Sequence, residues 1–454
     1  MKRQDTPSLT ETEKNRFMDK VMDINGSLIG NILGLDVGTS GIRATVVSPT
    51  NVLLHTDQEE MPFPTRDNTI SEQSPAVWED SLKRLLKRLQ LNSVLPEIKY
   101  IVADATSSTV LLMDDHLTPL TPALMYDDKR AVEQATKITE YAPTNSAAHG
   151  SSSTLAKVMW LEESLQQKPS QKGYKIAHQI DWVNSFFTQA SCPTDANNAL
   201  KLGFDPVENK WPDWVQQLVN SPLPEVVMPG TVIGKLSPAI ADTYGFSNEV
   251  QVLAGTTDSI AAFLASGAKK LGDATTSLGS TLCLKLLTDK PIFSPEHGIY
   301  SHILGDLWLV GGASNTGGAV LLKYFTLPEI IQLLDEIDIN QPTNLDYYPL
   351  LTPGERFPIA NSDLQPKVSP RPSDDQNFLL ALIEGLVGIE KLGYELLEQL
   401  SSTQIQTIYT AGGGTKNTAW MALRANRLGY KTKKAAQTDA AFGVTQLLFR
   451  SFGQ

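Results

Sequence analysis

Two segments far apart in the chain share one pattern, in which a run of apolar or β-branched residues leads into a turn of small residues and a second such run. Residues 32–47 carry this pattern around Gly38–Gly41, and residues 275–287 carry it around Gly279-Ser280. The pattern is typical of two strands joined by a tight turn. The two segments are alike in pattern and not in identity. Because each opens one half of the chain, they predict a duplicated fold with a cleft between its halves.

The rest of the chain alternates between strand-like and helix-like stretches. In residues 77–89 the apolar positions recur along one face of a helix. Mixed strands and helices in this order predict an α/β layer structure. The further predicted strands are 52–55, 98–102, 110–113, 250–254 and 406–409, and the further predicted helices are 154–165, 180–189, 256–266 and 418–428.

A chain of 454 residues is too long for one ordinary core and predicts two large domains. We expect an N-terminal domain over residues 31–245 and a C-terminal domain over residues 246–454, joined through the proline-rich stretch Pro222–Pro238. Residues 1–30 are polar, carry both signs of charge and lack the apolar stretch of a secretory signal. They are expected to form a flexible extension.

Composition excludes several classes of protein. Apolar residues make up 41% and charged residues 19%, which is typical of a globular protein. The formal net charge of −12 leaves no basic face for nucleic acid. No apolar run reaches the roughly 18 residues of a membrane-spanning helix. Two cysteines in so long a chain fit a cytoplasmic protein with reduced thiols.

The first small-residue turn is the strongest candidate for binding a nucleotide. Asp36 ends a strand and is followed by Gly38, Thr39, Ser40 and Gly41. Backbone amides at such a turn can bind phosphate oxygens, and the Asp36 carboxylate can hold Mg²⁺ through the water shell of the ion. An ordinary hairpin turn would have the same residues. No GxxxxGK[ST] motif occurs, which excludes a P-loop.

Two glycine-containing turns in the second half are further candidates. Gly279, Ser280 and Thr281 form a turn that could face the same phosphates, or a plain hairpin. The adjacent glycines Gly412, Gly413 and Gly414 follow a predicted strand and precede a predicted helix, so that the backbone can approach a ligand closely. Asn417 could bond a ribose hydroxyl. A simple connecting loop would explain this segment equally well.

Asp258 lies in Thr256-Thr257-Asp258-Ser259, at the start of an apolar helix. Thr and Asp are favoured at helix starts, where the helix dipole also stabilises an acid, so capping accounts for the residue. The functional alternative is a general base that takes the proton of an attacking hydroxyl group. In phosphoryl transfer the remaining work is positioning and charge neutralisation.

Taken together and in this order, these segments resemble the FGGY carbohydrate kinases, which belong to the group of actin, hexokinase and the heat-shock chaperones. The resemblance covers residues 31–450 and implies two actin-like (ribonuclease H-like) domains. It is closest to the plant and cyanobacterial D-ribulose kinase group, sometimes called xylulose kinases. The segments that carry this finer resemblance are 178–182, 197–201, 255–263, 277–281, 311–318 and 354–358.

The resemblance implies a role for each matching residue. Asp36 and Thr39 would serve the phosphates and Mg²⁺, and Asp258 would be the base. Asp36, Asp258 and Ser107 would contact the sugar. The nucleotide residues implied are Gly412, Gly413, Gly414 and Asn417. The sequence departs from the family where Ala105 replaces an expected glycine. It departs again at residues 126–130, where Tyr-Asp-Asp-Lys-Arg replaces Trp-Asn-Asp-x-Arg in the sugar pocket.

The implied reaction is ATP-dependent phosphorylation of a ketopentose, with D-ribulose giving D-ribulose 5-phosphate. D-xylulose as the substrate is one alternative, and an actin- or chaperone-like ATPase without phosphate transfer to sugar is another. The resemblance implies ATP and Mg²⁺ as cofactors and a monomer or homodimer as the assembly.

Overall fold

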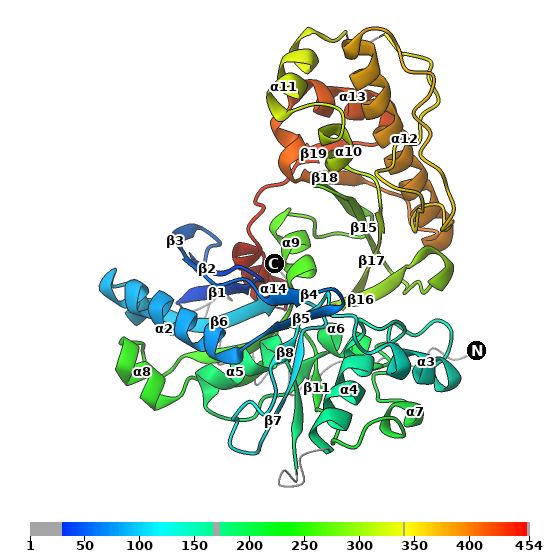
Figure 1. Cartoon of the computed structure of the whole chain (residues 1–454). Helices are drawn as coiled ribbons and strands as arrows, with labels where there is room; N and C mark the ends of the chain where they lie inside the picture. The colour runs from blue at the N-terminus through cyan, green and yellow to red at the C-terminus, as the bar shows by residue number, and fades with distance from the viewer. Residues whose placement is uncertain (1–29, 167–172, 339–340, 452–454) are drawn as a thin grey trace, which may run out of the picture. The chain divides into compact units, whose positions relative to one another are not determined.

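The computed structural model describes residues 30–166, 173–338 and 341–451, so the extension expected over residues 1–30 lies almost wholly outside it. The chain forms two compact units (Figure 1). The first unit comprises the chain up to Ala265 together with the segment from Asp439, and the second unit comprises Ser266–Thr438. The boundary therefore lies later than the expected one at 245/246, and the chain returns to its first unit at the C-terminal end.

The six-stranded sheet of the first unit has the order β12-β13-β6-β1-β2-β3. Strands β1, β2 and β3 pair antiparallel, whereas β6 lies parallel to β1 and β13 lies parallel to β6. The bounds are β1 (Asn31–Val37), β2 (Gly41–Val47), β3 (Leu53–Glu60), β6 (Ile98–Ala105), β12 (Val232–Lys235) and β13 (Gln251–Thr257).

Helices cover both faces of this sheet. On one face, α2 and α5 enclose a core in which Trp78 and Trp182 meet edge to face at 5.6 Å. On the other face, α9 and α14 pack together against the sheet (Figure 1). A side chain at Gly443 would place its Cβ 1.8 Å from the Ala261 carbonyl oxygen, so only glycine permits this close approach. The bounds are α2 (Pro75–Leu91), α5 (Gln179–Thr188), α8 (Pro238–Tyr244), α9 (Asp258–Ala265) and α14 (Ala440–Ser451).

A five-stranded sheet of order β4-β5-β8-β7-β9 completes the first unit, with α3 and α4 packed together and α4 against β7. The stretch Pro222–Pro238, expected to join two domains, lies inside this unit, and Pro238 begins α8. The remaining elements are β4 (Thr65–Asp67), β5 (Ile70–Gln73), η1 (Leu95–Glu97), β7 (Val110–Met113), β8 (Ala123–Leu124), α3 (Val132–Tyr141), α4 (Thr154–Gln166), β9 (Lys175–His178), β10 (Thr194–Asp195), α6 (Ala196–Ala199), η2 (Leu200–Leu202), α7 (Asp213–Gln216) and β11 (Val226–Val227).

The sheet of the second unit, β16-β17-β15-β14-β18-β19, repeats the plan of the first. Strands β14, β15 and β17 pair antiparallel, β18 lies parallel to β14, and β19 lies parallel to β18. The strand order and directions match β1, β2, β3, β6 and β13, which confirms the predicted duplication. The bounds are β14 (Asp273–Leu278), β15 (Leu282–Thr288), β16 (Tyr300–Leu304), β17 (Leu307–Ser314), β18 (Thr407–Ala411), β19 (Thr432–Lys434), η3 (Pro295–His297), α10 (Gly318–Leu322), α11 (Leu327–Glu336), α12 (Asp375–Ser401), η4 (Gly413–Lys416) and α13 (Thr418–Leu428).

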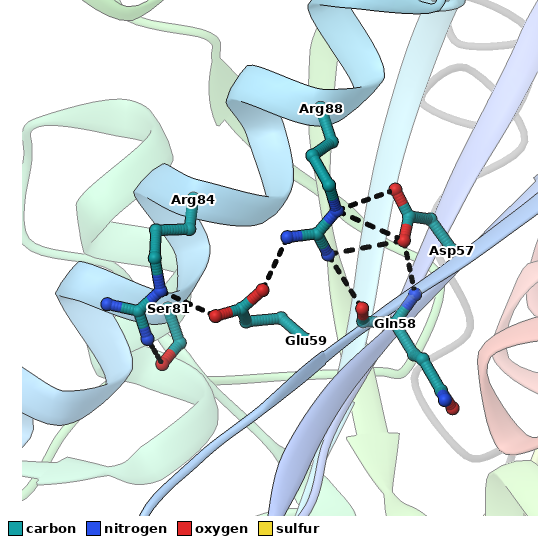
Figure 2. A network of polar contacts seen from close by, with 6 residues as sticks. All are labelled: Asp57, Gln58, Glu59, Ser81, Arg84 and Arg88. Carbon is teal, nitrogen blue, oxygen red and sulfur yellow. Dashed lines mark hydrogen bonds and ion pairs between the residues drawn. The ribbon is translucent and has the colours of Figure 1, made fainter.

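Helix α2 is fastened to the edge strand β3 by a network of charged groups (Figure 2). The Arg88 guanidinium donates to both Asp57 carboxylate oxygens at 3.2 Å, to the Gln58 carbonyl oxygen at 2.6 Å, and to Glu59. Arg84 also donates to Glu59. Burial opposes ionisation of Glu59, but the two guanidinium groups outweigh it and lower the pKa of this carboxyl. The network covers part of an otherwise open sheet edge.

Replacing Arg88 with alanine should lower the free energy of unfolding of the first unit by about 1 kcal/mol, because one guanidinium serves three acceptor residues. Salt at 1 M should shrink this difference, since exposed charges are screened. Urea unfolding at low and high salt measures both effects. Lys83→Ala on the same helix is the control, because Lys83 makes only an exposed pair with Glu79. Equal losses for the two variants would contradict the role assigned to the network.

Candidate active site

The parallel strands of the first unit bring three acidic residues to one edge of the sheet. Two of them are predicted site residues, and the third is not. In the register of β1 and β6, Asp36 lies beside Asp104, and in the register of β6 and β13, Asp104 lies beside Thr256. Asp258 follows two residues later, as the first residue of α9. Asp36 and Asp258, which are predicted site residues, therefore belong to one carboxylate cluster. Its central member is Asp104, which the sequence did not single out.

The Asp104 side chain is fully buried. Burial is the largest of the causes that raise the pKa of Asp104 well above its ordinary value. The nearby carboxylates of Asp36, Asp258 and Asp439 raise it further. Neither of its oxygens receives a hydrogen bond from an N–H or O–H donor. An interaction with Asp104 partly offsets the rise in the pKa of Asp36. Burial and the neighbouring carboxylates therefore make ionisation of Asp104 unfavourable inside this acidic cluster.

Asp36 itself is 5% exposed and pairs with Arg43, whose Nη1 lies 2.7 Å from Oδ2. Burial raises the pKa of Asp36, and the Arg43 guanidinium only partly opposes that shift. Beyond Asp36 the turn closes through a hydrogen bond from the Gly38 amide to the Gly41 carbonyl at 3.0 Å. Thr39 is half-buried and Ser40 is exposed at its tip.

Two acids of the cluster begin helices. The Asp258 carboxylate is half-buried and accepts from the Ser259 amide at 2.7 Å. Asp439 precedes α14, accepts from the Ala441 amide at 3.0 Å, and faces Thr45 on β2. Both positions stabilise an ionised carboxylate through the helix dipole. Asp439 was missed because no pattern in the sequence indicates that the chain returns to the first unit.

Ser107 lies half-buried in the turn that follows β6. The segment 126–130, which replaces the family's usual sugar-pocket motif, is held by its own charges. Asp128 is fully buried, accepts from the Ser71 amide at 2.7 Å and forms a double hydrogen bond with Arg130. The acid and the arginine of this segment therefore pair with each other, while Tyr126 is 44% exposed.

In the second unit, the two predicted nucleotide turns lie side by side, because β14 and β18 are parallel and end together at Ser277 and Ala411. Gly412 has a φ of +92°, and a Cβ there would lie 2.6 Å from the Leu278 carbonyl oxygen, so glycine is required. The Asn417 side chain caps α13 by accepting from the Trp420 amide at 2.8 Å. That cap uses its oxygen and leaves the amide donors of the side chain for a ligand.

The turn Gly279–Thr281 is fixed from one side. The carbonyl oxygens of Gly279 and Ser280 accept from the amides of Gly318 and Ala319 at 2.9 and 3.2 Å. Because a trans peptide directs its C=O and N–H groups oppositely, the amides of Ser280 and Thr281 face away from the Gly318 turn. These amides can therefore bind an anion.

An apolar pocket lies behind this turn. Its walls come from β14, β15, α10, α12 and α13, and its lining residues are Leu278, Gly279, Leu282, Gly317, Gly318, Leu386, Val387, Glu390 and Trp420.

A buried ion pair lies beneath both nucleotide turns. Arg424 on α13 donates to Glu390 on α12, with Nε 2.7 Å from Oε2, and both side chains are almost fully buried. The same guanidinium donates to Thr410 on β18 at 2.9 Å and to Thr276 on β14 at 3.2 Å. The pair therefore ties together the two strands that carry the turns.

The same five-strand plan in both units is that of the actin-like fold, which solved sugar kinases share. The chain belongs to the FGGY family of carbohydrate kinases: the family's N-terminal domain matches residues 31–265 and its C-terminal domain matches residues 274–448. Members of this family transfer a phosphoryl group from ATP to an alcohol group of the substrate.

Known proteins similar to the chain include kinases for different sugars. A xylulose kinase of Lactococcus lactis is 23% identical over 87% of this chain and 82% of its own length. A gluconokinase of Bacillus subtilis is 22% identical over 86% of this chain and 81% of its own length. The crystal structure of a ligand-bound xylulose kinase from Lactobacillus acidophilus has a TM-score of 0.79 at 18% identity, over 93% and 89% of the two chains.

Replacing Asp104 with asparagine should stabilise the metal-free first unit at neutral pH. A carboxyl whose pKa is raised on folding contributes stability at low pH, and that contribution is lost as the pH rises through the folded pKa. Asparagine does not titrate and has nearly the same shape as the aspartate side chain. The advantage of the variant should therefore shrink as the pH falls toward 3.8, the ordinary pKa of the carboxyl. Thermal unfolding in EDTA between pH 3.5 and 8 measures it.

Asp114→Asn provides the control of opposite sign. The backbone amides of Thr118 and His116 donate to Asp114 and lower its pKa, so its stabilising contribution is lost as the pH falls. The Asp114 variant should be less stable than the parent protein at neutral pH. A destabilised Asp104→Asn variant at neutral pH would contradict the raised pKa of Asp104.

Replacing Arg424 with methionine should destabilise the second unit by about 3–5 kcal/mol, because it leaves the Glu390 carboxylate buried without its partner. The double variant Arg424→Met, Glu390→Gln should lose less than the sum of the two single variants, since the charge is then removed as well. Urea unfolding of the four proteins measures this coupling. Strictly additive losses would show that the two side chains do not act as a pair.

Proposed function

We propose that the chain catalyses the ATP-dependent phosphorylation of a ketopentose, with D-ribulose as the substrate and D-ribulose 5-phosphate as the product. The observation that carries the proposal is the carboxylate cluster of the first unit. Within it Asp104 is fully buried, with a pKa that burial raises, while Asp258 is half-buried at the start of α9. Asp439 is half-buried as well, but Asp258 lies in the Thr257-Asp258 segment that resembles the base motif of the family. Asp258 therefore serves as the general base in this proposal.

Asp36 and Ser107 contact the sugar in this proposal. The nucleotide is bound by two sets of residues: Gly38, Thr39 and Ser40 in the first unit, and Gly279, Ser280, Thr281, Gly412, Gly413, Gly414 and Asn417 in the second. The backbone amides of these turns bind phosphate oxygens, and the amide group of Asn417 donates to the ribose. Such positioning and charge neutralisation supply most of the catalysis in phosphoryl transfer.

Mg²⁺ fits the carboxylate cluster, because the carboxylates of Asp36, Asp104, Asp258 and Asp439 lie near one another. Among the residues that the structure describes, no three acidic, histidine or cysteine side chains converge as a direct ligand set. Asp36 would therefore hold the ion through water, in keeping with the hydration that Mg²⁺ retains in proteins. When bound, the ion would neutralise charge on the phosphates.

D-xylulose is the second candidate substrate, and the names of the similar proteins favour it. The two ketopentoses differ in configuration at one carbon. The D-ribulose assignment is supported by the segments shared with the D-ribulose kinase group. The altered residues 126–130 keep the acid and the arginine but reshape the sugar pocket, so they do not decide between the two sugars. A site that hydrogen-bonds one hydroxyl configuration rejects the other strongly, because a mismatched hydroxyl leaves buried polar groups unpaired.

Mass spectrometry of sugar phosphates, after incubation with ATP, Mg²⁺ and a panel of ketopentoses, aldoses and polyols, tests the function. D-ribulose should give the largest kcat/KM, and Asp258→Asn should lower kcat by about 10²–10⁴-fold. Asparagine caps a helix about as well as aspartate, so the loss would reflect the missing base. Asp213→Asn is the control, since Asp213 also begins a short helix of the first unit.

Each alternative gives a different result in this experiment. A larger kcat/KM for D-xylulose than for D-ribulose would show that D-xylulose is the preferred substrate. The proposed reaction would then still stand. ATP hydrolysis without any sugar phosphate would overturn the kinase proposal in favour of an ATPase. Full activity of the Asp258→Asn variant would show that Asp258 only caps α9.

A further inference from the structure

The turn after β6 contains a residue in an unfavourable backbone conformation. Ser108 has a φ of +68°, in the left-handed region that residues other than glycine rarely adopt. Such conformations persist only where surrounding groups enforce them. The Ser108 hydroxyl donates to the Ser152 carbonyl oxygen at 2.9 Å and accepts from the Thr154 hydroxyl at 3.1 Å. Ser107, the proposed sugar contact, is its direct neighbour.

Lys157 on α4 provides a third attachment for this turn. Its side chain is fully buried, and its Nζ donates to the Ser108 carbonyl oxygen and, at 2.9 Å, to the Met125 carbonyl oxygen. Met125 directly precedes the segment 126–130. One buried amine therefore joins the turn that carries Ser107 to the segment that stands in for the sugar-pocket motif of the family.

The same helix holds the far end of that segment. Trp160, one turn beyond Lys157, lies under the Arg130 guanidinium at 4.8 Å from its ring centre. Arg130 in turn pairs with Asp128 and, at 2.8 Å, with Glu72 on β5. Helix α4 thus contacts Met125, the residue just before the segment, and Arg130, its last residue.

Burial explains why this lysine suits a bridging role. Burial and the Lys201 ammonium lower the pKa of Lys157 to about 7, against the opposing carboxylates of Asp128 and Asp127. The neutral amine has two N–H groups, which match the two carbonyl acceptors. The bridge therefore does not depend on a full buried charge, which would be costly.

We propose that Lys157 is a positioning residue for the sugar, which holds Ser107 and the segment 126–130 at a fixed spacing without touching the substrate. The proposal rests on the proposed sugar-kinase function. Loss of the bridge should weaken sugar binding selectively, because both of its acceptors belong to segments on the sugar side of the first unit. Lys157 makes no contact with the nucleotide turns of either unit in the hydrogen bonds described above.

The decisive variant is Lys157→Met, which is unbranched and one atom shorter and removes the donors. It should raise KM for the preferred ketopentose by about tenfold or more, as expected for the loss of two buried hydrogen bonds, and leave KM for ATP within about twofold. Adding Ser108→Gly should restore part of the sugar affinity, because glycine adopts a positive φ without the bridge.

Glu162→Gln is the matched control on the same helix. Glu162 is also buried, but it accepts hydrogen bonds from Asn220 and Ser221, away from the turn and the segment 126–130. It should lower the melting temperature without a selective change in KM for the sugar. Thermal unfolding of every variant separates lost stability from lost positioning.

An unchanged KM for the sugar in Lys157→Met, or equal increases in KM for sugar and ATP, would overturn the positioning role while the kinase function stands. If KM for the sugar rises in Lys157→Met and adding Ser108→Gly does not lower it again, then Lys157 does not act by maintaining the backbone conformation of Ser108. If the parent protein phosphorylates no sugar, the proposed function fails first and this proposal fails with it.

Discussion

The parallel pairing of β1 with β6 and of β6 with β13 is the constraint on which the site of the first unit depends. Carboxyl ends of parallel strands meet at one sheet edge, so this pairing places Asp36, Asp104 and Asp258 together although they are far apart in sequence. The return of α14 to the same sheet adds Asp439. Strand register, rather than any local motif, therefore creates the acidic cluster.

Burying acids close together is energetically unfavourable, and the two units stabilise their buried polar groups in different ways. In the first unit, burial raises the pKa of Asp104 and lowers the pKa of Lys157 to about 7, so burial disfavours the charged form of both groups. In the second unit, Arg424 and Glu390 are buried as an ion pair, with the threonines of two strands as further partners. Lys157, Arg424 and Glu390 thereby gain hydrogen-bond partners in place of water, whereas neither oxygen of Asp104 has one in the structure.

Local patterns predicted the elements well and the long-range arrangement less well. The helix predicted over residues 418–428 is α13, and the two predicted hairpins are β1–β2 and β14–β15. Pro222–Pro238 was wrongly taken as the connection, because prolines that begin a helix or flank a strand resemble those of a linker. Asp104 ends its strand as Asp36 does, but no glycine turn follows it. Its importance comes from neighbours that only the folded sheet provides.

Residues that position a ligand need not lie in the loops that contact it. The proposed nucleotide turns of the second unit follow strands joined by Arg424, a residue of α13, and the turn with the proposed sugar contact Ser107 is held by Lys157, a residue of α4. Both are fully buried basic side chains on helices that pack behind the loops. A rigid helix fixes such a donor more closely than a loop can, so substitutions that never touch a ligand are expected to change the affinity for one substrate and not for the other.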